Sequence, residues 1–227
     1  MKKPLIILTG PTAVGKTSLS IALAKAVNGE IISADSMQVY RHMDIGSAKI
    51  RPEEMHGVPH HLVDCLEPDE EFNVVRFQQM TKEAMEGIYA RGRIPVLVGG
   101  TGFYIQAVTG DIDFTVHGED TTYRRMLEEK AKTEGAQVLH EMLAAVDPAS
   151  AEAIHANNVK RVIRALEYYQ QTGKPISQHN EEQRQKESPY NLAYFVLNDE
   201  RSRLYERIDA RIDQMLDEGL IDEVKAL

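Results

Sequence analysis

The residues best suited to chemistry lie near the start of the chain, in the glycine-rich segment GPTAVGKT at residues 10–17. Every fixed position of the pattern G-x-x-x-x-G-K-[ST] is filled. Gly10 and Gly15 let backbone N–H groups converge on an anion, and a helix that begins here adds its positive end. Lys16 supplies a mobile ammonium, and the Thr17 hydroxyl suits a Mg²⁺ ligand. The segment predicts a site for a di- or triphosphate without saying which.

A second candidate is Asp35, which directly follows the apolar run EIISA at residues 30–34. In an open α/β sheet, ligands gather at the carboxyl ends of the strands, so Asp35 is expected near the glycine-rich segment. There its carboxylate could take a proton from an incoming nucleophile. An aspartate at this place could equally cap a turn or a helix. The spacing alone leaves both interpretations open.

A third candidate is the segment Gly-Gly-Thr-Gly at residues 99–102, after the apolar run at 94–98. Its three glycines expose backbone N–H groups, and Thr101 adds one hydroxyl for a close ligand. The alternative is a tight connection between a strand and a helix. Three strand ends that converge favour one shared site.

Other polar groups are weaker candidates. His56, His60 and His61 do not predict a metal centre, because Gly57 and Pro59 interrupt the helical register and no cysteine or acid completes the ligand set. The expected helix at 149–172 carries a basic cluster, and its composition is typical of a charged face in solvent. The same interpretation applies to Arg124 in the expected helix at 120–134. The cluster consists of Lys160, Arg161 and Arg164.

Two features of nucleotide hydrolases are missing. There is no Asn-Lys-x-Asp segment to read guanine, and the strand at 94–98 ends in glycines rather than in a metal-binding aspartate. Asp64, after His61-Leu62-Val63, is a weak substitute for that aspartate. The chain therefore favours a transferase that handles phosphoryl or diphosphate groups.

The elements that position these residues alternate between strand and helix. This pattern predicts an α/β fold with a P-loop NTPase-like parallel sheet, flanked by helices and interrupted by an all-helical insertion. The expected parts are residues 1–112 and 191–227 for the sheet domain and 113–190 for the insertion. Further strands are expected at 4–9 and 192–198, and helices at 16–27 (ended by Gly29), 75–91, 103–108 and 200–218.

Composition limits the class of protein. The 227 residues carry a net charge of −9, whereas a protein that coats nucleic acid is usually basic, so contact with nucleic acid is expected to be local. A single cysteine excludes an internal disulfide and fits a reducing compartment. No apolar run reaches the roughly 20 residues that span a bilayer. We expect a cytoplasmic, soluble protein without a membrane partner, and a monomer.

Seven segments in order resemble the tRNA dimethylallyltransferase (tRNA isopentenyltransferase) family over residues 4–227. The resemblance implies transfer of a dimethylallyl group from dimethylallyl diphosphate to the exocyclic N6 amine of the adenosine just 3′ of the tRNA anticodon, with release of diphosphate and with Mg²⁺ as cofactor. The segments are GPTAVGKT, DSMQVY, GSAK, HHLVD, GGTGFY, NNVKRVIRALE and RLYERIDARIDQML with GLIDEV.

The resemblance also implies roles for single residues. Asp35 corresponds to the general base, with Thr101 and Lys16 as further catalytic residues and Thr17 beside the metal. The diphosphate-binding residues are Gly10, Pro11, Thr12, Ala13, Val14, Gly15, Lys16 and Thr17. The residues expected to contact tRNA are Asp35, Ser36, Met37, Gln38, Thr101, Arg124, Asn158, Lys160, Arg161 and Arg164.

The family usually continues beyond the GLIDEV segment into a basic, aromatic-containing region, whereas this chain ends at Leu227. We therefore expect a truncated or short form that lacks part of the tRNA surface. Two other functions remain open at this point. A small-molecule kinase would use Asp35 as the base on a hydroxyl and would bind ATP, and a non-enzymatic module would bind RNA in a nucleotide-dependent way.

Overall fold

The computed structural model describes residues 2–114 and 122–227. The chain forms two compact units, residues 1–112 with 188–227 and residues 113–187. The boundaries expected from the sequence follow residues 112 and 190. Each unit is described by itself.

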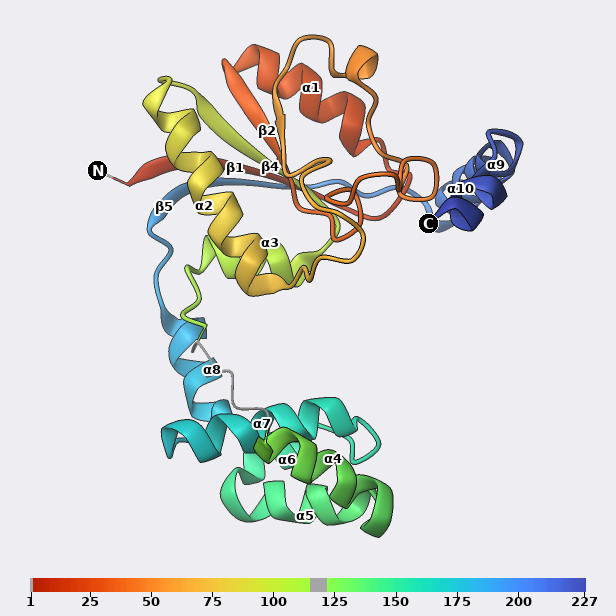
Figure 1. The fold of residues 1–227 in the computed structure, drawn as a ribbon. Coiled ribbons are helices and arrows are strands. Elements are labelled where there is room, and N and C mark those ends of the chain that lie inside the picture. Colours follow the sequence, from red (N-terminus) through yellow and green to blue (C-terminus); the bar gives the residue numbers. More distant parts are fainter. Residues whose placement is uncertain (1, 115–121) are drawn as a thin grey trace. The chain divides into compact units, whose positions relative to one another are not determined.

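The first unit is built on one parallel sheet of five strands (Figure 1), so the predicted fold class is confirmed. The spatial order is β3-β2-β4-β1-β5, which places the ends of β2, β4 and β1 side by side. The strands are β1 (Lys3–Thr9), β2 (Gly29–Ser33), β3 (His60–His61), β4 (Ile94–Gly99) and β5 (Tyr190–Val196).

Helices cover both faces of this sheet, because alternate residues of its apolar strands point to opposite sides. Leu5 and Ile7 pack in a cluster with residues of α2 and α3, whereas Ile6 packs with residues of α1. The helices of the unit are α1 (Lys16–Ala26), α2 (Val74–Ala90), α3 (Gly102–Thr109), α9 (Arg201–Asp217) and α10 (Leu220–Ala226), with a 3₁₀ turn at Pro52–Met55.

The end of α1 differs from the prediction. Gly29 was expected to end the helix, but the left-handed residue is Asn28, with φ of 52°. Asparagine tolerates this conformation because its short polar side chain bonds locally. Gly29 instead opens β2, where a Cβ would lie 2.7 Å from the Ile94 carbonyl oxygen. Its hydrogen side chain lets β2 approach β4.

The apolar residues of the last long helix, expected at 200–218, are only partly buried. Leu204 is buried in α9, but the side chain of Ile212 is 47% exposed. The helix forms as predicted, and in the described residues its apolar face is largely open.

The second unit is a bundle of five helices in its described part. Leu127, Leu139 and Leu143 are fully buried and meet Val162 and Leu166 in one core. The helices are α4 (Thr122–Glu134), α5 (Ala136–Val146), α6 (Pro148–Ala153), α7 (Val159–Thr172) and α8 (Ile176–Gln185). The first positions of the helix predicted at 120–134, residues 120 and 121, lie outside the described residues.

The prediction of a single helix at 149–172 is wrong, because the chain forms two helices there, α6 and α7, with a break between them. His155 bonds the break internally, since its ring nitrogen accepts the Asn157 N–H at 3.2 Å and its carbonyl accepts the Asn158 N–H at 2.8 Å. Two successive asparagines are poor helix formers, and Asn158 then serves as the N-cap residue of α7.

The buried carboxylate of Glu30 joins three elements at the start of β2. Glu30 is 1% exposed and accepts hydrogen bonds from Arg91 at 2.9 and 2.7 Å, from Arg93 at 3.0 Å, and contacts His61 at 2.6 Å. The hydrogen bonds from Arg91 outweigh the cost of burial and lower the pKa of Glu30 to about 2.

We predict that Glu30→Gln lowers the free energy of unfolding at pH 7 by about 3 kcal/mol, the value of a pKa fall from 4.5 to about 2. A depressed pKa stabilises the fold above the unfolded value of 4.5, and this contribution fades as the pH falls towards 2. Urea unfolding at several pH values measures it, with the exposed Glu86→Gln as control. An equal loss at pH 7 and pH 3.5 would contradict the assignment.

Candidate active site

Three strand ends meet at one edge of the sheet, as the sequence predicts. Gly99 ends β4, and a Cβ there would lie 2.2 Å from the Ala34 carbonyl oxygen at the end of β2. A Cβ on Gly100 would lie 3.6 Å from the Gly10 carbonyl oxygen, which follows β1. The missing side chain of Gly99 therefore lets the segment after β2 approach the end of β4, and Gly100 lies next to the start of the phosphate loop.

The phosphate loop, residues 10–17, has the backbone of an anion site. Gly15 stands before α1 in the left-handed conformation, with φ of 91°, and no side chain caps the first turn. The first turn also holds no acid. The Lys16 ammonium folds over the loop and donates to the carbonyls of Gly10 at 2.8 Å and Pro11 at 2.7 Å. The end of the helix and the ammonium together offer positive charge to an anion.

Asp35 uses one carboxylate oxygen as a turn cap. Its Oδ1 accepts the N–H of Met37 at 2.8 Å and of Gln38 at 3.3 Å. Among the residues that the structure describes, none donates to Oδ2. The turn-cap interpretation from the sequence is therefore confirmed, while the role of Oδ2 as a base stays a prediction.

Electrostatics links Asp35 to the phosphate loop. Burial lowers the pKa of Lys16, and the Asp35 carboxylate acts against that shift. The positive charge of Arg211 acts in the same direction as burial. Asp35 and Arg211 thus act on the Lys16 ammonium in opposite directions.

Thr101 is the N-cap residue of α3 and is half-buried. Its carbonyl accepts the N–H of Tyr104 at 3.0 Å, while its hydroxyl makes no cap bond with the helix. The glycine segment is thus the tight strand–helix connection that was one of the two interpretations. The hydroxyl at this connection is the group that the other interpretation needs.

Gln38 is held on all sides. Its Nε2 donates to the carbonyls of Ser47 and Ala48, both at 3.3 Å, and its Oε1 accepts the Ser33 hydroxyl at 3.1 Å. This network orients the amide beside a cavity of about 50 Å³ that Thr17 also lines.

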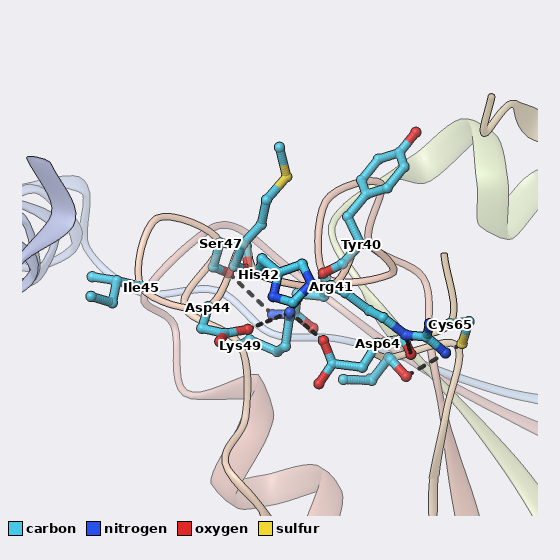
Figure 2. Close-up of polar contacts among 12 residues, drawn as sticks. Tyr40, Arg41, His42, Asp44, Ile45, Ser47, Lys49, Asp64 and Cys65 are labelled. Atoms are coloured by element: carbon cyan, nitrogen blue, oxygen red, sulfur yellow. Dashed lines mark hydrogen bonds and ion pairs between the residues drawn. The ribbon is translucent and has the colours of Figure 1, made fainter. Parts of the chain in front are cut away.

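The side chain of Lys49 joins its own segment, which follows Gln38, to the segment that contains Asp64 (Figure 2). Its side chain is only 3% exposed, and its Nζ contacts Asp44 and Asp64, each at 2.5 Å, and the Tyr40 carbonyl at 2.6 Å. Asp64, considered from the sequence as a weak substitute for a metal-binding aspartate, is therefore a partner of this lysine. The acids compensate a buried cation that would otherwise be costly.

Two arginines of α9 were not assigned a role from the sequence. Arg207 donates to the Ala13 carbonyl of the phosphate loop at 3.4 Å and pairs with Asp199 at 3.0 Å. Arg211 approaches the Ala48 carbonyl at 3.5 Å. The signal was their spacing of four, which places both on one face of a helix.

The predicted tRNA contacts of the second unit cluster at the start of α7. Asn158, Lys160 and Arg161 are exposed there, and Arg164 is half-buried one turn on. Arg124 lies on α4, where its guanidinium makes a two-point contact with Glu167 at 3.0 and 2.8 Å. That contact fixes α4 against α7. The role of these residues toward tRNA stays a prediction.

Thr17 is exposed in the first turn of α1 and lines the same cavity as Ser33. No group of three His, Cys, Asp or Glu residues that could hold a metal occurs among residues 2–114 and 122–227. Mg²⁺ usually keeps several waters and takes one or two protein oxygens besides substrate phosphates. A single hydroxyl next to an anion site fits that habit.

Comparison with known proteins decides the family. The model of the family described as IPP transferase matches residues 38–227, and that described as Isopentenyl transferase matches residues 3–65. A tRNA dimethylallyltransferase of Lachnoclostridium phytofermentans is 68% identical over 222 residues, 98% of this chain and 71% of that protein. The chain belongs to the tRNA dimethylallyltransferase family. It is an enzyme of the prenyltransferase type. This finding favours the prediction of prenyl transfer over the alternative of a small-molecule kinase.

Solved structures of tRNA isopentenyltransferases and dimethylallyltransferases share the fold. The full-length tRNA isopentenylpyrophosphate transferase of Bacillus halodurans is 50% identical, with a TM-score of 0.69 over all of this chain and 70% of that one. A eukaryotic dimethylallyltransferase described as acting on tRNA is 34% identical, with a TM-score of 0.86 over 99% of this chain and 55% of that one. In the described residues of this transferase, no helix is long and apolar enough to cross a membrane.

Proposed function

We propose that this enzyme transfers a dimethylallyl group from dimethylallyl diphosphate to N6 of the adenosine 3′ of the tRNA anticodon, with release of diphosphate. The observation that carries the proposal is the meeting of an anion loop and a carboxylate at one sheet edge, in a chain of this family. The phosphate loop supplies the diphosphate site, and Asp35 supplies the base.

The chemical task divides between the leaving group and the nucleophile. An allylic carbon loses diphosphate readily because its cation is delocalised, so stabilising the developing charge on the diphosphate favours the step. Backbone N–H groups at the start of α1 and the ammonium of Lys16 are placed to do this. Arg207 and Arg211 add positive charge from α9 beside the same loop.

The amine is a poor nucleophile until its proton can leave. We assign that proton to Oδ2 of Asp35, because Oδ1 is already held by two backbone N–H groups. The carboxylate then takes the proton as the N6–carbon bond forms and the carbon–oxygen bond to diphosphate breaks. The adenine must first leave the anticodon stack, at a cost of a few kcal/mol.

We further propose Mg²⁺ as the cofactor, with Thr17 as its protein ligand and substrate phosphates as the others. When bound, the ion would neutralise charge on the departing diphosphate. The tRNA substrate and a single cysteine support a cytoplasmic location, and we expect a monomer.

The exposed basic groups at the start of α7 are proposed to contact tRNA phosphates. Lys160→Ala with Arg161→Ala should weaken tRNA binding and lower the magnitude of the slope of log K against log salt by about 1.4, the value of two single-stranded phosphate contacts. Affinity for dimethylallyl diphosphate should not change. Lys174→Ala, an exposed lysine just beyond α7, is the control. An unchanged salt slope together with an unchanged affinity for tRNA would contradict this role and indicate that Lys160 and Arg161 only form a charged face in solvent.

Equilibrium binding separates prenyl transfer from the kinase alternative. We expect dimethylallyl diphosphate to bind with Mg²⁺ at micromolar or lower Kd and ATP to compete poorly. Tight ATP binding with weak binding of the prenyl diphosphate would favour the kinase and contradict the proposal.

A further inference from the structure

The carboxylate of Glu223 lies in a nest of three successive backbone N–H groups. Its Oε2 accepts the N–H groups of Asp44 and Ile45, both at 2.7 Å, and its Oε1 accepts that of Gly46 at 2.9 Å. Glu223 belongs to α10, more than 170 residues further along the chain. Burial opposes its ionisation, but these hydrogen bonds outweigh burial and lower the pKa of Glu223.

The nest belongs to a tight loop, residues 43–49, that is bonded within itself. The Ala48 N–H donates to the Ile45 carbonyl at 2.9 Å, and the Lys49 N–H donates to the Asp44 carbonyl at 2.9 Å. Inside the loop, the buried Lys49 ammonium holds Asp44 (Figure 2). Lys49 from within and Glu223 from outside therefore fix the same few residues.

The opposite end of this loop holds Gln38. The carbonyls of Ser47 and Ala48 both accept from Nε2 of Gln38, each at 3.3 Å, and so orient its amide. The backbone N–H of Gln38 in turn donates to Oδ1 of Asp35. A continuous set of bonds thus runs from α10 through loop 43–49 to Gln38 and the proposed base.

We propose that Glu223 is a positioning residue that, by holding loop 43–49, fixes the amide of Gln38 for recognition of the adenosine. The inference rests on the proposed function. It predicts a defect in use of the RNA substrate, because Gln38 is among the residues expected to contact tRNA, whereas the diphosphate is expected at the loop of residues 10–17.

A double-mutant cycle tests whether Glu223 acts through Gln38. Glu223→Ala should lower kcat/KM for an anticodon stem-loop about tenfold, within the range of coupled neighbours, and leave KM for dimethylallyl diphosphate within about twofold. Glu223→Gln should fall between, since its amide keeps one acceptor. In a Gln38→Ala background, Glu223→Ala should add less than about twofold. The control is Asp222→Ala, whose side chain on the same helix is 87% exposed.

A second measurement does not depend on activity or on the Gln38 variant folding. In a ¹⁵N–¹H spectrum the Gln38 side-chain amide should give two resolved, slowly exchanging resonances, which Glu223→Ala broadens or shifts to solvent values.

Three results would overturn the inference. These are unchanged kcat/KM in Glu223→Ala, a full tenfold loss in the Gln38→Ala background, or an unchanged Gln38 amide resonance. If the unaltered enzyme transfers no prenyl group to RNA, the proposed function fails first, and the inference with it.

Discussion

Asp35→Asn should slow dimethylallyl transfer by about 10²–10⁴-fold, the usual range for loss of general base catalysis. Affinity for dimethylallyl diphosphate should stay near that of the unaltered enzyme. The asparagine Oδ1 can still accept the N–H groups of Met37 and Gln38, so the turn is kept. What is lost is the basicity of the second oxygen. Single-turnover transfer to an anticodon stem-loop, with both substrates saturating, measures the rate of the chemical step.

The same variant separates three roles for Asp35. A residue that only caps a turn would tolerate asparagine, because both residues cap well. A metal ligand would show weaker Mg²⁺ dependence together with weaker diphosphate binding. A rate within about threefold of the unaltered enzyme, well short of the range for base loss, would remove Asp35 from the mechanism.

Lys16→Ala should lower kcat/KM for transfer by about 10²–10³-fold, the scale for one electrostatic group at a developing charge. The loss should arise because the variant binds the diphosphate less tightly. The Lys16 ammonium contacts only loop carbonyls among the described residues, so the fold should survive. Binding of dimethylallyl diphosphate and thermal unfolding of the variant check both parts.

Lys25→Ala is the matched control, an exposed lysine near the other end of α1. It should bind prenyl diphosphate and react as the unaltered enzyme does. Unchanged affinity for prenyl diphosphate in Lys16→Ala would contradict the role assigned to this lysine.

The sheet could be read from the sequence because its signals are local. Apolar runs such as PLIILT and IPVLV mark strands buried on both faces, and a phosphate loop must follow a strand and open a helix. The segment after Asp35 could not be read in this way. Its structure depends on Lys49 and Glu223, which bond residues far apart in the chain. No periodicity records such contacts.

The helical unit shows the same limit. The pattern over residues 149–172 predicts one helix because it rests on the spacing of apolar residues alone. The break at His155 to Asn158 arises from local hydrogen bonds of polar residues, which that spacing does not record. Helix α5 and the two-residue strand β3 were not predicted. A strand of two residues has no periodicity to detect, and it is defined by its pairing with Ile31 and Ile32.

The central claim is prenyl transfer to one adenosine of tRNA, and product analysis tests it most directly. The enzyme is incubated with Mg²⁺, tRNA and dimethylallyl diphosphate labelled in the allyl group, and the RNA is digested to nucleosides. We predict label on N6 of the adenosine 3′ of the anticodon, one diphosphate released per label, and no label when that adenosine is replaced by guanosine. Unlabelled RNA under these conditions, or label that persists with guanosine at that position, would contradict the account.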